Sequence, residues 1–179
     1  LIIDPKQAFG TGHHATTQLL IEWLQQLVRP DDRVLDVGTG SGILAMVALR
    51  LGAAEALGVD FDAVAVECAR EYAQVNGFDG RLTLAVGHAQ VRPPHETLNP
   101  TLVLANLDRQ TLLASADMLC EYAAGGARLL LSGLLVEQRA EIEAAYASRG
   151  VYVKAVRERD GWLALEATGM ETCDGGLCS

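Results

Sequence analysis

Strand-like and helix-like segments alternate along almost the whole chain, and this alternation constrains the fold more than any other feature. Short apolar runs predict strands at 33–37, 55–60, 81–86, 101–106 and 127–133, and two more strands within 151–167 that turn at the letters RDG. Apolar residues at helical spacing predict helices at 14–28, 43–51, 63–76, about 107–123 and 136–148. Strict alternation requires parallel strands joined by crossover helices. The sequence therefore predicts an α/β fold, a doubly wound and mostly parallel seven-stranded sheet with helices on both faces and an antiparallel C-terminal hairpin.

Length and charge limit the number of domains and the kinds of partner. The chain has 179 residues, of which 50% are hydrophobic, and this suffices for one well-buried domain, which we assign to residues 1–168. The formal net charge is −9 and no window clusters Lys and Arg, so we expect no binding to a long nucleic acid. No apolar run approaches the ~20 residues of a membrane span, and no secretory leader opens the chain. We expect a cytoplasmic protein without a membrane partner.

The four cysteines do not form a metal-binding pattern. Cys68 and Cys120 lie in helix-like segments, where a small buried thiol is the ordinary interpretation. Cys173 and Cys178 are spaced more widely than the cysteines of a zinc knuckle, and no second pair accompanies them. We therefore predict no metal site and expect residues 169–179 to be a flexible tail.

A glycine-rich turn follows the first predicted strand, in the letters DVGTGSG. Gly38, Gly40 and Gly42 allow a sharp turn and leave the backbone accessible to a ligand, and the next helix directs its N–H groups toward the same place. In doubly wound sheets, ligands bind at the carboxyl ends of the strands, where this turn falls. The pattern predicts a ligand site, and a purely structural turn is the alternative.

The spacing of the glycines discriminates among nucleotide cofactors. The dinucleotide fingerprint G-x-G-x-x-G requires glycine at position 43, which is Ile43, and a Walker loop requires Lys followed by Ser or Thr. An acid, Asp60, ends the second predicted strand, where its carboxylate can accept both hydroxyls of a ribose. A nucleotide-binding oxidoreductase is thereby weakened but stays open as an alternative.

Several motifs together resemble a known group of enzymes. The letters VLDVGTGSG, the acid at the end of the second strand and the closing hairpin resemble class I S-adenosylmethionine (SAM) methyltransferases. The stretches DPKQAFGTGHHATTQLLIEWL and LVLANL more closely resemble the catalytic domain of the ribosomal protein L11 methyltransferase (PrmA) family, over about residues 4–162. The resemblance implies SAM as cofactor and N-methylation of a ribosomal protein, on a lysine or an α-amine. A different protein or small-molecule acceptor, or a catalytically silent SAM-binding protein, are the alternatives.

The resemblance also implies roles for individual residues. Thr17 matches a threonine that contacts SAM, Gly38 the first glycine of the motif, Asp60 the ribose-binding acid, and Asn106 the asparagine that ends the fourth strand. These four residues come from separate predicted elements, and a doubly wound sheet would bring them to one edge.

Further cofactor contacts are expected from side-chain chemistry. Asp36 and Gly40 can face the methionine moiety, and Phe61 can pack on the face of the adenine. His88 follows the third predicted strand, where it either contacts the adenine or is an ordinary exposed loop histidine.

The segment before the first predicted helix is expected to fold as a flap over the ligand. Phe9 and Thr11 are the cofactor contacts that we predict in it. The adjacent His13 and His14 lack a third ligand, so we predict capping and loop hydrogen bonds for them rather than a metal site.

The residues after the fourth predicted strand border the expected transfer site. Where the family commonly reads ANILAGPL, this chain continues from Asn106 with Leu107, Asp108, Arg109 and Gln110. Methyl transfer from a sulfonium needs mainly a well-positioned acceptor. We predict that the Asn106 side chain and the Leu107 carbonyl orient the amine. Asp108 is the third catalytic candidate, and a helix N-terminal acid is its alternative role.

Members of the family carry an N-terminal domain that presents the ribosomal protein, whereas this chain starts almost at the expected flap. Two interpretations follow. The chain is a catalytic module that binds SAM normally and methylates the ribosomal protein slowly by itself, or it is a stand-alone relative with another acceptor.

Overall fold

A computed structural model describes residues 1–2, 14–78, 80–91 and 98–170 of the chain. Its strands are β1 (Arg33–Val37), β2 (Glu55–Asp60), β3 (Leu82–Val86), β4 (Leu102–Asn106), β5 (Arg128–Leu135), β6 (Val151–Arg159) and β7 (Trp162–Gly169). Its helices are α1 (Ala15–Leu27), α2 (Ile43–Arg50), α3 (Ala63–Val75), α4 (Arg109–Ala114), α5 (Ala116–Ala124), the short 3-10 helix η2 (Val136–Gln138) and α6 (Arg139–Ala147). The predicted alternation of strands and helices is confirmed.

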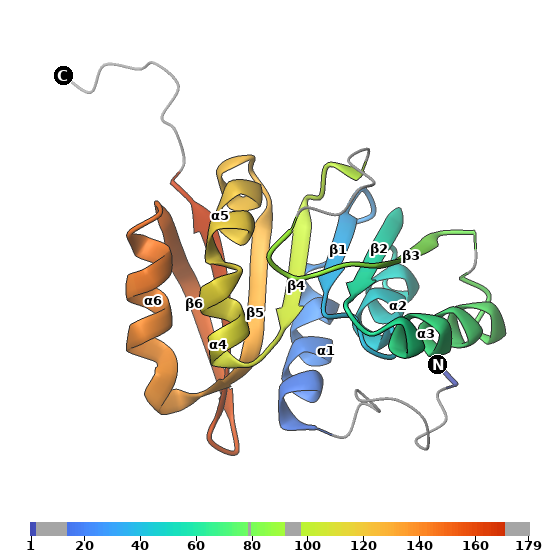
Figure 1. The fold of residues 1–179 in the computed structure, drawn as a ribbon, viewed down its shortest axis with the longest axis horizontal. Coiled ribbons are helices and arrows are strands. Elements are labelled where there is room, and N and C mark those ends of the chain that lie inside the picture. The colour runs from blue at the N-terminus through green and yellow to red at the C-terminus, as the bar shows by residue number, and fades with distance from the viewer. Residues whose placement is uncertain (3–13, 79, 92–97, 171–179) are drawn as a thin grey trace.

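All seven strands form one sheet in the order β3-β2-β1-β4-β5-β7-β6 (Figure 1). The pairs from β3 to β5 are parallel, and β7 is antiparallel to both of its neighbours, β5 and β6. The strand order reverses between β1 and β4, so the carboxyl ends of these strands meet the turn after β1. The closing hairpin is confirmed, and its antiparallel member is inserted beside β5, while the edge strand β6 runs in the direction of the parallel strands.

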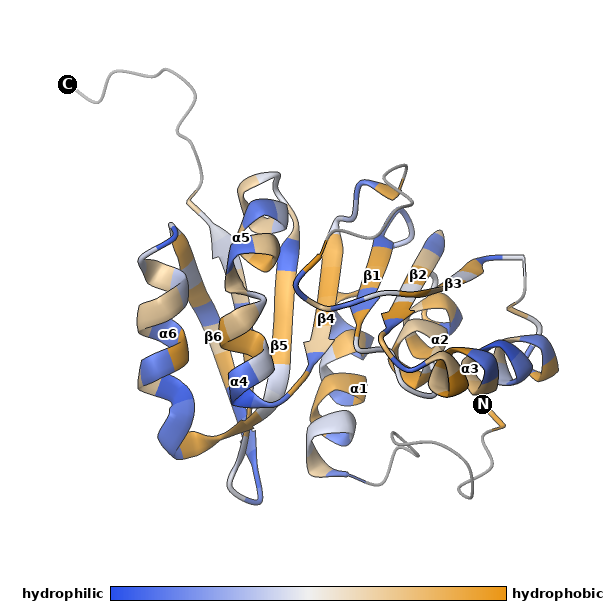
Figure 2. Cartoon of the chain, in the orientation of Figure 1, coloured by the Kyte–Doolittle hydropathy of each residue, from blue (hydrophilic) through white to orange (hydrophobic). Residues whose placement is uncertain are grey.

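Hydrophobic residues cover both faces of the sheet. On one face, α1, α2 and α3 pack their apolar sides against Leu102, Leu104 and other inward residues. On the other face, α4, α5 and α6 pack against Val103, Leu129 and their neighbours. Successive side chains of a strand point to opposite faces, so a strand covered on both sides is apolar along its length. Figure 2 shows this as hydrophobic colouring along β1, β4 and β5.

The helix expected at about 107–123 is divided in two, which corrects the prediction. Asp108 is the N-cap of α4, so the helix begins at Arg109 rather than at Leu107. Ser115 separates α4 from α5, and its buried hydroxyl donates to the carbonyl oxygen of Thr111 at 2.7 Å. A serine that bonds back to the preceding turn competes with the regular helical pattern and bends the chain.

A buried ion pair ties the sheet to the end of α1. Arg128 at the start of β5 donates to both carboxylate oxygens of Asp32, at 2.8 and 2.7 Å, and to the carbonyl oxygen of Leu27. Burial alone would raise the pKa of Asp32, but bonds from the Arg29 amide, the Thr101 hydroxyl and Arg128 together hold it below its ordinary value. Within the described ranges, no helix is both long and apolar enough to cross a bilayer.

Candidate functional site

The glycine-rich turn lies at the carboxyl end of β1, beside β2. The amides of Gly38 and Thr39 both donate to the carbonyl oxygen of Val59, at 2.8 and 3.0 Å, so the turn is held against the end of β2. Gly38 has φ +72°, and a Cβ built there would lie 2.3 Å from Cδ2 of Leu107. The positive φ favours glycine at position 38, and a larger residue there would also displace the end of the Leu107 side chain.

Asp36 lies behind the turn, with 1% of its surface exposed. Its Oδ2 accepts from the Thr39 hydroxyl at 2.8 Å and from the Ala45 amide at 3.2 Å, which fixes the turn to the first residues of α2. Burial raises the pKa of Asp36 to about 6, against the effect of these two bonds, and the nearby Asp60 carboxylate adds to the rise. We expected Asp36 to face the ligand, but its buried carboxylate points to the turn and does not line the cavity described next.

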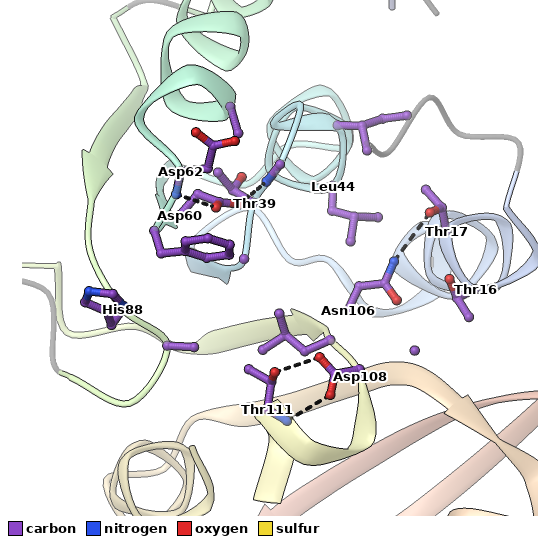
Figure 3. A pocket seen from close by; sticks show the side chains of 18 of the residues that line it. Thr16, Thr17, Thr39, Leu44, Asp60, Asp62, His88, Asn106, Asp108 and Thr111 are labelled. Carbon is purple, nitrogen blue, oxygen red and sulfur yellow. Dashed lines mark hydrogen bonds between the residues drawn. The ribbon is translucent and has the colours of Figure 1, made fainter. Parts of the chain in front are cut away.

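A cavity of about 800 Å³ opens in front of the turn, at the carboxyl ends of the central strands (Figure 3). It is bounded by the start of α1, the glycine turn, the ends of β2 and β4, and the start of β7. Nine residues with predicted site roles line it, namely Thr17, Gly38, Gly40, Asp60, Phe61, His88, Asn106, Leu107 and Asp108. The structure thus brings these residues from five separate regions of the chain to one place.

Asp60 ends β2 and joins the two sides of the cavity wall. Its Oδ2 accepts from the Gly40 amide at 2.8 Å, and its Oδ1 accepts from the Asp62 amide at 3.0 Å, as the dashed lines in Figure 3 show. Each carboxylate oxygen has two acceptor positions, so each retains capacity for a hydroxyl group. Asp60 is 8% exposed and lines the cavity, so its carboxylate is oriented by these two bonds and is still accessible from the cavity.

Two flat side chains stand at one end of the cavity. The rings of Phe61 and His88 are nearly parallel, with an interplanar angle of 9° and centroids 6.5 Å apart. Phe61 is 71% exposed despite its large apolar ring. An exposed aromatic ring beside a cavity is typical of a surface that a flat ligand covers.

The start of α1, the end of β4 and the start of β7 form the other end of the cavity. The Asn106 amide donates to the Thr17 hydroxyl at 3.4 Å, which links the end of β4 to α1 (Figure 3). His14 caps α1 through Nδ1, which lies 3.4 Å from the Thr16 amide and 2.8 Å from its hydroxyl. The His14 ring also contacts the Trp162 ring edge-on, with centroids 4.6 Å apart. The expected capping role of His14 is confirmed by these bonds.

Asp108 lines the cavity and also caps α4. Its two oxygens accept from the Thr111 amide and hydroxyl at 3.1 and 2.7 Å, and the hydroxyl bond in particular lowers the pKa of Asp108. A carboxylate held in its charged form by a helix cap is a poor acceptor for a proton. The geometry favours the capping role that the sequence offered as the alternative for this residue.

Some site residues could not be placed, and others were not predicted. Phe9, Thr11 and His13, Cys173 and Cys178 lie outside the described residues. Among the residues that are described, no three His, Cys, Asp or Glu side chains group as metal ligands. The cavity is also lined by residues that were not predicted as site residues, among them Thr39, Gly133 and Trp162. Gly133 could have been found, because a glycine inside an apolar strand often marks a bulge or a close backbone approach. Thr39 stands between two glycines of the predicted turn, whereas no pattern in the sequence places Trp162 at the site.

Known proteins with similar sequences share one description. Ribosomal protein L11 methyltransferases from Ralstonia pickettii and Burkholderia cenocepacia are 46% and 41% identical to the chain, over 92% and 96% of it. The alignments cover 53% and 55% of those proteins, so the chain spans about half the length of the curated relatives that it matches.

Solved structures agree with the sequence comparison. A ribosomal protein L11 methylase from Lactobacillus delbrueckii subsp. bulgaricus is 28% identical and superposes with a TM-score of 0.82, over 93% of this chain and 83% of that one. The O-methyltransferase NcsB1 shares the fold, with 20% identity and a TM-score of 0.63 over 76% of this chain and 48% of that one. The family model described as ribosomal protein L11 methyltransferase matches residues 1–169. The chain therefore belongs to the ribosomal protein L11 methyltransferase (PrmA) family.

Proposed function

We propose that the chain is a SAM-dependent methyltransferase unit that transfers a methyl group to an amine of ribosomal protein L11, on a lysine or an α-amine. The observation that carries the proposal is the cavity at the strand ends, where Asp60, the glycine turn and Asn106 meet in a member of this family. Ribosomal proteins are made and assembled in the cytoplasm, so the proposal places the protein there.

The residues of the cavity fit the chemistry of SAM. Asp60 has acceptor capacity for the ribose hydroxyls, and the parallel rings of Phe61 and His88 offer flat surfaces for the adenine. Among the described lining residues, the side chains of fixed charge are the carboxylates Asp60, Asp62 and Asp108. A cavity lined by negative charge favours a cationic ligand, and SAM carries a sulfonium and an ammonium group.

The main task of the chain in the transfer is to position the acceptor amine. SAM supplies an electrophilic methyl group, so the protein needs mainly to hold a neutral amine in line with it. The side-chain oxygen of Asn106 and the carbonyl of Leu107 are the acceptors that we assign to the amine. The bond from Asn106 to Thr17 ties the Asn106 side chain to α1, which limits its movement. Asp36 does not touch the ligand in this proposal and instead shapes the turn from behind.

The first experiment measures cofactor binding. Isothermal calorimetry should show SAM binding and no comparable binding of NADH. Asp60→Ala removes charge-assisted hydrogen bonds worth about 1.5–3 kcal/mol each, so the Kd for SAM should rise at least about tenfold. Asp31→Ala, which removes an exposed carboxylate before β1, is the matched control and should leave the Kd unchanged. Tight NADH binding without SAM binding would reject the proposed cofactor.

The second experiment identifies the acceptor. Radiolabelled methyl groups from SAM should appear on purified ribosomal protein L11, and mass spectrometry should locate them on amine nitrogens. Asn106→Ala should lower kcat by roughly a hundredfold, because it removes a group that positions the acceptor. In a parallel reaction with a cell lysate, methyl label on other proteins but not on L11 would refute the proposed acceptor and leave the cofactor assignment in place.

A further inference from the structure

Leu107 lies between two glycines, one in the turn after β1 and the other in β5. On one side, the Leu107 side chain lies over Gly38, after β1. On the other side, the Leu107 backbone lies against Gly133 in β5, and its amide donates to the carbonyl oxygen of Ser132 at 3.0 Å. Leu107, Gly38 and Gly133 all line the cavity. Leu107, which directly follows β4, is therefore held from both sides at the cavity wall.

The contact with Gly133 is made by backbone atoms. A Cβ built on Gly133 would lie 2.2 Å from the Leu107 carbonyl oxygen, 2.7 Å from its carbonyl carbon and 3.0 Å from its amide nitrogen. Atoms cannot approach so closely, and a carbonyl group cannot avoid the contact by changing rotamer. At Gly38, by contrast, a Cβ would meet the flexible end of the Leu107 side chain. A side chain at position 133 would therefore displace the Leu107 peptide itself.

The sheet is locally irregular at Gly133, in a way that suits this contact. The pairing of β5 with β7 shifts between Ser132 and Leu134, so Gly133 is the extra residue of a bulge, and its φ is +89°. The Ser132 hydroxyl donates to the carbonyl oxygen of Leu163 at 2.7 Å and ties the bulge to β7. Bulges next to functional sites reorient a strand locally. Here the bulge brings a position without a Cβ to face the Leu107 carbonyl.

We propose that Gly133 is a positioning residue for methyl transfer, because the absence of a Cβ fixes the Leu107 carbonyl where it orients the acceptor amine. The inference rests on the proposed function, in which the Leu107 carbonyl is one of the two acceptors for the amine. It assigns to Gly133 an effect on the transfer step and none on cofactor binding. A misplacement of about 1 Å in a positioning group can reduce a rate a hundredfold.

The test compares Gly133→Ala with Gly126→Ala. Gly126 precedes β5 and has φ +93°, but a Cβ there has no atom within 4 Å, so this control carries the same backbone strain without the contact. We expect Gly133→Ala to lower kcat for L11 methylation at least about a hundredfold. Its Kd for SAM should stay within about threefold of the wild type, and Gly126→Ala should change neither value.

Hydrogen exchange gives a readout that does not depend on activity. The Leu107 amide should exchange at least about tenfold faster in Gly133→Ala than in the wild type, because its bond to Ser132 is displaced, and should be unchanged in Gly126→Ala. If Gly133→Ala does not fold, Ser132→Ala loosens the bulge without adding atoms, and kcat should then fall about tenfold at unchanged SAM affinity.

The outcomes separate the two proposals. A wild-type protein that binds no SAM, or that transfers no methyl group to L11, overturns the proposed function itself. A wild type that is active, with kcat unchanged in Gly133→Ala, overturns only the positioning role. Loss of SAM affinity in parallel with kcat would also overturn it, because the residue would then shape the cofactor site.

Discussion

The buried carboxylate of Asp36 makes stability depend on pH in a defined direction. Its pKa in the folded protein is about 6, against 3.8 for an ordinary aspartate, because burial disfavours the charge. The folded state thus binds the proton more tightly than the unfolded state does. The stabilising contribution of the protonated group is present at acid pH and is lost as the pH rises through about 6. Above that pH, the protein folds around a buried negative charge.

Asp36→Asn should remove this pH dependence while keeping the local bonds. Both donors, Thr39 and Ala45, bond to Oδ2, so a single amide oxygen at that position can accept from both. The difference between a pKa of about 6 and one of 3.8 corresponds to about 3 kcal/mol over the full titration. Between pH 5 and pH 8 only part of it titrates, so the wild type should lose about 1 kcal/mol more than the variant.

Urea unfolding at pH 5 and at pH 8, monitored by tryptophan fluorescence, gives the free energy of unfolding at each pH. The quantity is the change in the free energy of unfolding between the two pH values, compared between wild type and variant. Any cost of burying the new amide group is the same at both pH values and cancels. Asp31→Asn, at an exposed carboxyl, is the control and should behave as the wild type. Equal pH dependence in the wild type and Asp36→Asn would refute the reasoning.

Two further predictions concern stability. Arg128→Met leaves the buried Asp32 carboxylate without its cation, so the free energy of unfolding in urea at pH 7 should fall by about 3 kcal/mol. A loss below about 1 kcal/mol would mean that the bonds from Arg29 and Thr101 suffice. Asp108→Ala removes the cap of α4 and should cost about 1 kcal/mol, with faster hydrogen exchange at the Thr111 amide. Unchanged exchange there would contradict the capping role.

The order of strands and helices could be predicted from sequence because both periods are clear in it. In β4, Leu102 and Leu104 pack on one face and Val103 on the other, so the run is apolar throughout and reads as a buried strand. The insertion of β7 beside β5 could not be predicted, since two consecutive antiparallel strands can dock in either order. The break at Ser115 depends on one side-chain bond to Thr111, which competes with a helical pattern that is otherwise continuous.

The predicted part of the site follows from where strands end. Gly38, Asp60 and Asn106 end or follow neighbouring parallel strands, so any correct topology brings them to one edge. The direction of a side chain next to the turn could not be predicted in the same way. Whether Asp36 faces the cavity or the helix behind it depends on the path of the turn, and its bonds to Thr39 and Ala45 turn it away. Trp162 lines the cavity because β7 lies beside β5, and this strand order could not be predicted from the sequence.

The contact between His14 and Trp162 has a consequence for the order of folding. These residues lie near the two ends of the described chain, and β7 must insert between β5 and β6 before their rings can meet. Contacts between residues distant in sequence form late, because a long loop must first be closed. During synthesis, the glycine turn and Asp60 emerge long before β7. The Asp60 side of the cavity can therefore form before β7 is translated, whereas the wall that Trp162 forms is closed only after β7 has emerged.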